Sequence, residues 1–198
     1  MTVISVNDVS LSFGARELFK NISFSLETND RLGIVGPNGC GKSTLLKTIV
    51  GAIPSLGGEF LIGANVRIGY FDQQMAQYTS NKTVLADFIA EFPGITNFEA
   101  RSALGAFLFS GEDVFKNIDM LSGGEKVRLA LCKILKRRPN FLILDEPTNH
   151  MDIIGKETLE NMLADYSGTL LFVSHDRYFV KKVADHILSF ENNCAVWY

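Results

Sequence analysis

Residues 36 to 44 of this chain read GPNGCGKST, a glycine-rich turn followed by a lysine and two adjacent hydroxyl side chains. Glycines let backbone N–H groups turn toward one point at the start of a helix, where the helix dipole favours anions. Such a loop is suited to the phosphates of a nucleoside triphosphate. An ordinary glycine turn is the alternative, but this spacing is expected by chance in roughly one chain of this size in a hundred.

The residues on either side give the motif the strand and the helix that it requires. Residues 32–35 read LGIV, which is typical of a buried strand, and apolar side chains at helical spacing follow the loop. We expect Lys42 to reach the β and γ phosphates, Ser43 to bind Mg²⁺ and Thr44 to hydrogen-bond the α phosphate. The residues expected to bind nucleotide are Gly36, Pro37, Asn38, Gly39, Cys40, Gly41, Lys42, Ser43 and Thr44.

Carboxylate and imidazole side chains follow two other apolar runs, each at the end of a predicted strand. The run FLIL precedes Asp145 and Glu146, and the run TLLFV precedes Ser174 and His175. Each could be a solvated turn on its own, but ligands of open α/β sheets bind beyond the carboxyl ends of strands. Together with the phosphate loop they predict one site. There Asp145 holds Mg²⁺ opposite Ser43, Glu146 orients and deprotonates the attacking water, and His175 hydrogen-bonds the γ phosphate.

A second pair of glycines opens a predicted helix at 123–136. Ser122 and Glu125 fit a capping box, which explains those two residues. The box does not explain Gly123 and Gly124, because glycine in the first turn of a helix costs stability. Exposed N–H groups at a helix N-terminus suggest a second phosphate site, and one nucleotide cannot easily fill both sites of one chain. The pattern therefore predicts dimerisation.

The order of strands and helices predicts an α/β fold with a parallel sheet covered on both faces. Turn signals at Asn7-Asp8 and at 28–30 divide the N-terminal region into short strands. Residues 59–62 and 66–71 form another expected strand pair. Residues 81–117 show the spacing of amphipathic helices, which indicates an inserted helical subdomain. The later elements expected are a helix at 123–136, a strand at 141–145, a helix at 156–164, a strand at 169–173, a helix at 177–184 and C-terminal strands.

Composition suits a globular core and excludes several classes of protein. The 198 residues are 46% hydrophobic and 21% charged, and the net charge of −3 is unlike the basic footprint of a nucleic-acid-binding domain. No run of about 18 apolar residues and no signal peptide is visible, so we expect a cytoplasmic protein without an intrinsic membrane segment. The three scattered cysteines lack metal-ligand spacing and are expected to be reduced thiols.

The chain resembles the ATP-binding cassette (ABC) superfamily in five features and in their order: GPNGCGKST, Gln73, LSGGE, FLILDEP and Ser174-His175. The resemblance covers nearly the whole chain. It implies a P-loop NTPase core of ABC ATPase type, with an N-terminal antiparallel β subdomain and an inserted helical subdomain at approximately 75–136. Residues 1–198 would then be a single nucleotide-binding domain.

The resemblance also implies roles for residues that spacing alone does not assign. The expected activity is hydrolysis of ATP with Mg²⁺. Phe13 resembles the aromatic residue that stacks on adenine. Gln73 resembles the glutamine that senses Mg²⁺ and the attacking water, with Gln74 as the register alternative. A module that binds nucleotide without hydrolysis is a further alternative, disfavoured by intact Glu146, Gln73 and His175.

Members of this superfamily form head-to-tail dimers, in which the LSGGE segment of one domain closes over ATP held by the other. The resemblance therefore implies that Ser122, Gly123, Gly124 and Glu125 contact the nucleotide of a second cassette, in a tandem chain or a homodimer. His150 and His186 have no comparable support, and we interpret both as structural.

Finer features, LSGGEK, EPTNHMD and SHDRYF, resemble the ABC-F branch, whose soluble members carry two cassettes in one chain and act on the ribosome. The short helical region, without the arm insertion of first cassettes, most resembles a second cassette. We expect an isolated half of a longer protein that acts on the ribosome and tRNA, with antibiotic resistance by ribosome protection as one such role. The alternative is the nucleotide-binding ATPase subunit of an ABC membrane transporter.

Four cations, Lys133, Lys136, Arg137 and Arg138, crowd the end of the helix that LSGGE begins. Positive charge at a helix C-terminus complements the helix dipole and solvates the surface. Contact with ribosomal RNA is the alternative interpretation. We expect the structural role.

Overall fold

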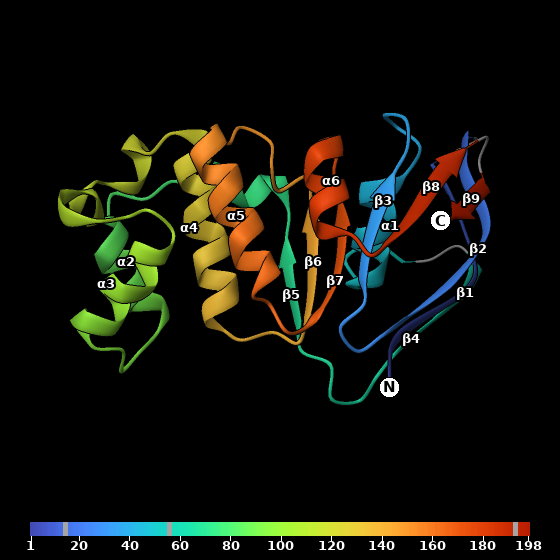
Figure 1. Cartoon of the computed structure of the whole chain (residues 1–198), viewed down its shortest axis with the longest axis horizontal. Helices are drawn as coiled ribbons and strands as arrows, with labels where there is room; N and C mark the ends of the chain where they lie inside the picture. Colours follow the sequence, from blue (N-terminus) through green and yellow to red (C-terminus); the bar gives the residue numbers. More distant parts are fainter. Residues whose placement is uncertain (14–15, 55–56, 192–193) are drawn as a thin grey trace.

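The computed structural model of the chain describes residues 1–13, 16–54, 57–191 and 194–198 (Figure 1). The strands are β1 (Thr2–Phe13), β2 (Arg16–Glu27), β3 (Arg31–Val35), β4 (Gly57–Ile62), β5 (Ile68–Phe71), β6 (Phe141–Asp145), β7 (Thr169–Val173), β8 (His186–Glu191) and β9 (Cys194–Trp197). They form a three-stranded sheet in the order β2-β1-β4 and a six-stranded sheet in the order β5-β6-β7-β3-β8-β9. The first sheet is antiparallel, and the second is parallel except for β9.

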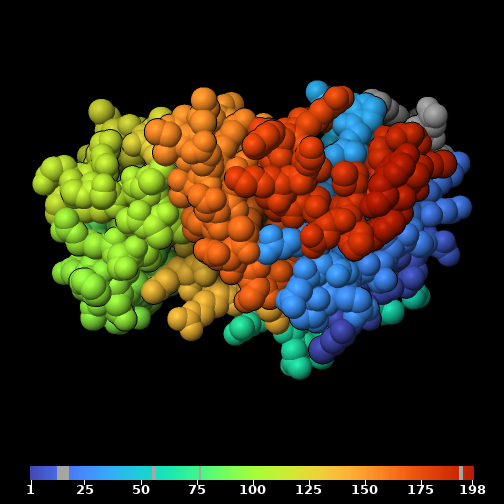
Figure 2. Space-filling model, in the orientation of Figure 1, coloured from blue at the N-terminus to red at the C-terminus, as the bar shows by residue number. Residues whose placement is uncertain are grey.

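Helices connect the strands and cover the six-stranded sheet. The α-helices are α1 (Lys42–Ile49), α2 (Val84–Glu91), α3 (Asn97–Ala106), α4 (Gly123–Lys136), α5 (Ile153–Ala164) and α6 (Arg177–Val183). Short 3₁₀ helices are η1 (Gln73–Gln77), η2 (Gly111–Phe115) and η3 (Ile118–Met120). Figure 2 shows the region of α2 and α3 at one end of the molecule and the antiparallel strands at the other. The predicted helical insertion is therefore present between β5 and β6.

The central strands of the six-stranded sheet are buried on both faces, as their apolar runs predict. All residues of β6 and β7 are buried. Along β6, Leu142 and Leu144 enter a core shared with α4, α5 and α6, whereas Phe141 and Ile143 enter a core shared with α1 and the antiparallel sheet. Helices thus cover one face, and α1 with the three-stranded sheet covers the other.

Two expectations for the N-terminal half are wrong. The turn expected at Asn7-Asp8 is a β-bulge, because β1 continues through it with a register shift between Val6 and Val9. Asp8 takes a left-handed φ of 49°. Its backbone N–H donates to Ser23 Oγ at 2.9 Å, so this group is hydrogen-bonded although the strand does not end there. The second error is the pairing of β4 with β5, which belong to different sheets.

Helix α5 begins three residues before its predicted start at 156. Asp152 caps it by accepting a hydrogen bond from the N–H of Gly155 at 3.0 Å. The first turn contains β-branched Ile153 and Ile154 and then a glycine, which all have lower helix propensity. Side-chain capping therefore fixes the start of this helix where local propensity does not.

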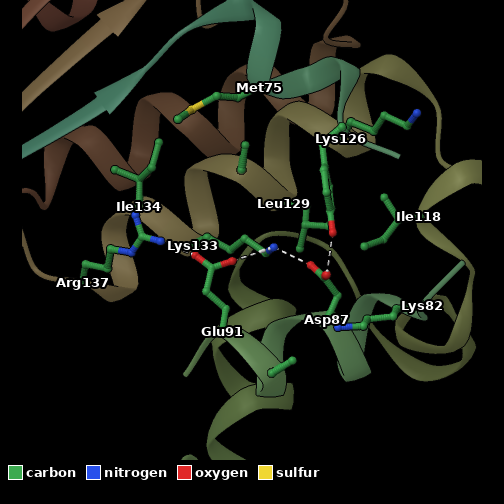
Figure 3. A pocket seen from close by; sticks show the side chains of 13 residues that line it. Met75, Lys82, Asp87, Glu91, Ile118, Lys126, Leu129, Lys133, Ile134 and Arg137 are labelled. Carbon is green, nitrogen blue, oxygen red and sulfur yellow. Dashed lines mark hydrogen bonds and ion pairs between the residues drawn. The ribbon is translucent and has the colours of Figure 1, made fainter. Parts of the chain in front are cut away.

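Ion pairs join α2 to α4 beside a surface pocket (Figure 3). The buried carboxylate of Asp87 accepts hydrogen bonds from Lys133 and, at 3.0 Å, from the hydroxyl of Tyr78. Lys133 also pairs with Glu91 at 2.7 Å, and Glu91 pairs with Arg137. Burial disfavours the charged form of Lys133, but its hydrogen bonds to Asp87 and Glu91 outweigh this and raise its pKa. Two of the four cations at the end of α4 therefore have structural partners.

This network predicts an unequal response to the loss of its members. Asp87→Ala should lower the free energy of unfolding by about 2–4 kcal/mol, because Lys133 loses one of two partners in a largely buried position. Arg137→Ala should change it by less than about 1 kcal/mol, because the Arg137 side chain is 61% exposed. Urea denaturation measures both values. Equal effects of the two substitutions would contradict this account of the network.

Candidate functional site

The phosphate loop joins the end of β3 to the start of α1, as its sequence requires. Gly41 is the N-cap of α1 with a left-handed φ of 98°, and a Cβ there would lie 3.0 Å from the ring of Phe19. Among the described residues, no side chain caps this helix. The backbone N–H groups of the first turn therefore have no competing side-chain acceptor at the helix end that favours anions.

Lys42 places a buried positive charge in the centre of the loop. Its side chain is folded back so that Nζ donates to the carbonyl oxygens of Gly36 and Pro37, both at 2.8 Å. Cys40 Sγ lies 3.9 Å from the same nitrogen. The residue is only 6% exposed, and the two carbonyls compensate for the loss of water around the ammonium group. The loop thus holds a cation at a fixed position.

Ser43 and Asp145 meet across the edge of the sheet. The Ser43 hydroxyl donates to Asp145 Oδ1 at 2.8 Å. Burial of the Asp145 carboxyl raises its pKa; the Ser43 hydrogen bond opposes this rise, while the charges of Asp72 and Glu146 add to it. A hydroxyl and a carboxylate are the hard oxygen ligands that Mg²⁺ prefers, and a nearby cation would relieve the repulsion among these acids. The donor set and its charge therefore fit magnesium.

Glu146 and His175 lie side by side at the ends of neighbouring strands. His175 Nε2 is 3.2 Å from Glu146 Oε1, and the backbone N–H of His175 donates to Glu146 Oε2 at 3.2 Å. Glu146 has a left-handed φ of 51°, and its own N–H donates to the carbonyl of Val173 at 3.0 Å. A turn directly after β6 thus directs the carboxylate toward His175, the second residue after β7.

A cavity at this sheet edge brings the phosphate loop together with two of the predicted catalytic residues. It is lined by residues 38–39 and 41–44 of the phosphate loop, by Glu146 and His175, and by Leu18 and Asn149. Leu18 is not predictable as a lining residue from the sequence, because it is one apolar residue among many in alternating strands. Asn149 also went unassigned, although the turn that brings it back is local: its N–H donates to the carbonyl of Glu146 at 3.2 Å.

Other predicted residues do not line this cavity. Gly36, Pro37 and Cys40 belong to the loop but contact Lys42 instead. The side chain of Phe13 lies outside the described part of the structure. Gln73 is exposed, and its Nε2 lies 3.2 Å from His150 Nε2.

The LSGGE segment also lies outside the cavity. The expected capping box is present: Glu125 N–H donates to Ser122 Oγ at 3.3 Å, and Ser122 N–H donates to the Glu125 carboxylate at 2.8 Å. A Cβ on Gly124 would lie 2.8 Å from the carbonyl oxygen of His150. Close packing against the segment after β6 is thus one reason for this glycine, which a local sequence pattern does not reveal.

Known proteins resemble this chain in sequence and in fold. A family model described as ABC transporter matches residues 19–149. YdiF of Bacillus subtilis (strain 168) is 50% identical and aligns with 96% of this chain and 30% of its own length. ABC transporter F family member 5 of Arabidopsis thaliana is 40% identical and aligns with 98% of this chain and 28% of its own length. Energy-dependent translational throttle protein EttA of Mycobacterium tuberculosis (strain ATCC 25618 / H37Rv) is 39% identical and aligns with 99% of this chain and 36% of its own length.

These relatives are much longer than the present chain, which spans between 28% and 36% of their length. A solved ABC transporter in an inward-facing conformation has a TM-score of 0.79 at 21% identity, covering 100% of this chain and 83% of that chain. This likeness confirms the predicted α/β fold with an antiparallel sheet beside a mainly parallel one. None of the helices in the described part of the chain has the length and hydropathy of a membrane span.

The environment of Asp145 predicts that its charge lowers the stability of the fold. Because its folded pKa is raised, stability decreases as the pH rises from the unfolded pKa through the folded pKa. Asp145→Asn should therefore raise the melting temperature at pH 7 without nucleotide, since the amide oxygen can still accept from Ser43. Asp185→Asn, at an exposed position, is the matched control and should leave the melting temperature unchanged. A lower melting temperature for Asp145→Asn, read by differential scanning calorimetry, would contradict this electrostatic assignment.

Proposed function

Because this chain belongs to the ABC transporter family and is an ATP-binding ATPase domain, we propose that it is one cassette of an F-branch protein that acts on the ribosome in the cytoplasm. The observation that supports hydrolysis is the convergence of Ser43 with Asp145 and of Glu146 with His175 at one edge of the sheet. The role in translation is supported by the F-branch relatives, one of which is named as a translational throttle protein.

The assignment of roles follows from what phosphoryl transfer needs, which is mostly charge neutralisation and positioning. Lys42 and the N–H groups of the loop hold the phosphates. Ser43 and Asp145 hold magnesium, which when bound with ATP would offset charge on the transferred phosphoryl group. Glu146 orients the attacking water and accepts its proton, and His175 hydrogen-bonds the γ phosphate. The contacts of His175 with Glu146 support a joint role for these two residues.

A second cassette is proposed to complete the site. Ser122, Gly123, Gly124 and Glu125 do not line the cavity of their own chain. Gly123 is exposed at the first turn of α4, where N–H groups favour an anion. We therefore assign these four residues to the nucleotide bound by a partner cassette, in a tandem chain or a homodimer. We assign Phe13 to adenine, and Gln73 to magnesium and the attacking water.

Loss of the proton acceptor tests the hydrolytic assignment. Glu146→Gln should bind ATP as the native chain does, because Lys42, Ser43 and Asp145 remain, but turnover should fall by about 100-fold or more. The variant with ATP bound should then accumulate as a closed dimer of two chains, which light scattering detects. Glu157→Gln, at an exposed position of α5, is the matched control with unchanged turnover. Native turnover in Glu146→Gln would refute the role of this carboxylate.

Ribosome association tests the proposed cellular role. The full-length protein with Glu146→Gln should cosediment with ribosomes of its source organism when ATP is present, since ATP-driven closure is proposed to create the binding form. Adding Lys42→Ala should abolish this association by weakening ATP binding. Cosedimentation that is absent, or equal with and without ATP, would contradict the proposal. An ATPase that fractionates with membranes instead would favour a transporter subunit.

A further inference from the structure

His150 connects two elements beside the candidate site. Its Nε2 lies 3.2 Å from Gln73 Nε2 at the start of η1. Its backbone packs against the start of α4, where a Cβ on Gly124 would lie 2.8 Å from the His150 carbonyl oxygen. Its φ of 64° lies in the left-handed region, which histidine and asparagine enter more readily than most residues. The backbone of His150 is thus fixed by α4, while its ring contacts Gln73.

The backbone of η1 is anchored at both ends. At the start, Asp72 accepts from the backbone N–H of Gln74 at 2.8 Å and pairs with Lys47 of α1 at 3.1 Å. At the other end, the hydroxyl of Tyr78 donates to a buried carboxylate of α2 at 3.0 Å. The backbone position of Gln73 is therefore set relative to the phosphate-loop helix. The direction of its flexible side chain still has to be set by some other contact.

The chemistry of the two groups determines which end of the amide His150 holds. An amide NH₂ group can only donate, so the unprotonated Nε2 of His150 accepts, and the ring proton is on Nδ1. This bond leaves the carbonyl oxygen Oε1 of Gln73 as the end available to a cation or to water. Oxygen is the atom that magnesium requires, whereas the amide nitrogen is not a suitable ligand.

We propose that His150 is a positioning residue, which binds the NH₂ end of Gln73 and so keeps its carbonyl oxygen available to magnesium and the attacking water. This inference rests on the proposed ATPase function. His150 itself touches neither nucleotide nor metal in this account. Because Gln73 and His150 are both exposed, their hydrogen bond contributes modestly, and its loss should change rates by several-fold and leave folding intact.

Two substitutions separate this role from a backbone role of His150. Asparagine tolerates the left-handed φ well, but its side chain is too short to reach where Nε2 lies. Glutamine tolerates that φ less well, yet its longer side chain brings an amide oxygen near the Nε2 position, where it can accept from Gln73. If His150 acts through its ring, the His150→Gln variant should hydrolyse ATP faster than the His150→Asn variant. If His150 matters only for the backbone turn, the His150→Asn variant should be the faster of the two.

The first measurement is the NMR spectrum of ¹⁵N-labelled chain without nucleotide, with the side-chain amide of Gln74 as internal reference. The Gln73 NH₂ resonances should be shifted and protected from exchange in the native chain and in His150→Gln. In His150→Asn they should resemble those of Gln74. His186→Asn, which alters a histidine stacked near Trp197, is the control and should leave them unchanged. Native-like Gln73 resonances in His150→Asn would overturn the proposal.

The second measurement is steady-state ATP hydrolysis in the full-length protein. His150→Asn should lower kcat by about three- to tenfold with KM changed by less than about twofold, and His150→Gln should recover most of the loss. Equal activities of the two variants, or a higher kcat for His150→Asn, would overturn the proposal. If the native protein itself lacks ATP turnover, the proposed function fails, while the NMR comparison still decides whether His150 holds Gln73.

Discussion

The hydrogen bond between Ser43 and Asp145 is the contact on which the rest of the site depends. It joins the first turn of α1, which follows β3, to the end of β6, and β7 lies between these two strands. Register makes this contact possible, because Val173 of β7 pairs with Ile34 on one side and with Asp145 on the other. The three strands therefore end at the same level. The residues that follow each strand then share one edge, with no further device needed to bring them together.

Much of this arrangement could be predicted from local sequence. Strands that are buried on both faces are continuous apolar runs, so β6 and β7 were recognisable, and the polar residues after them stood out. The phosphate loop was recognisable because its chemistry requires glycines, a lysine and hydroxyls in a fixed order. The capping box likewise marked the start of α4 at Gly123. In each case, one short segment carries both the signal and its physical cause.

Features that depend on distant contacts could not be predicted in this way. Asn7-Asp8 has the composition of a turn, but pairing with β2 on one side and β4 on the other keeps β1 continuous through a bulge. The glycine pair was explained only through a partner cassette, whereas Gly124 is also packed against the carbonyl of His150 in its own chain. His150 was interpreted as structural because its neighbours in sequence say nothing of Gln73, 77 positions away.

Ser43 and Asp145 are proposed to act as one unit on magnesium-bound ATP. A double-mutant cycle of Ser43→Ala and Asp145→Asn, with the affinity for a fluorescent ATP analogue measured with Mg²⁺ and with EDTA, tests this most directly. If the two residues act as one unit, each single substitution should remove most of the Mg²⁺-dependent affinity and the double substitution should remove little more, a coupling well above about 0.5 kcal/mol. Effects that add to within about 0.5 kcal/mol would contradict it, because the two residues would then act independently.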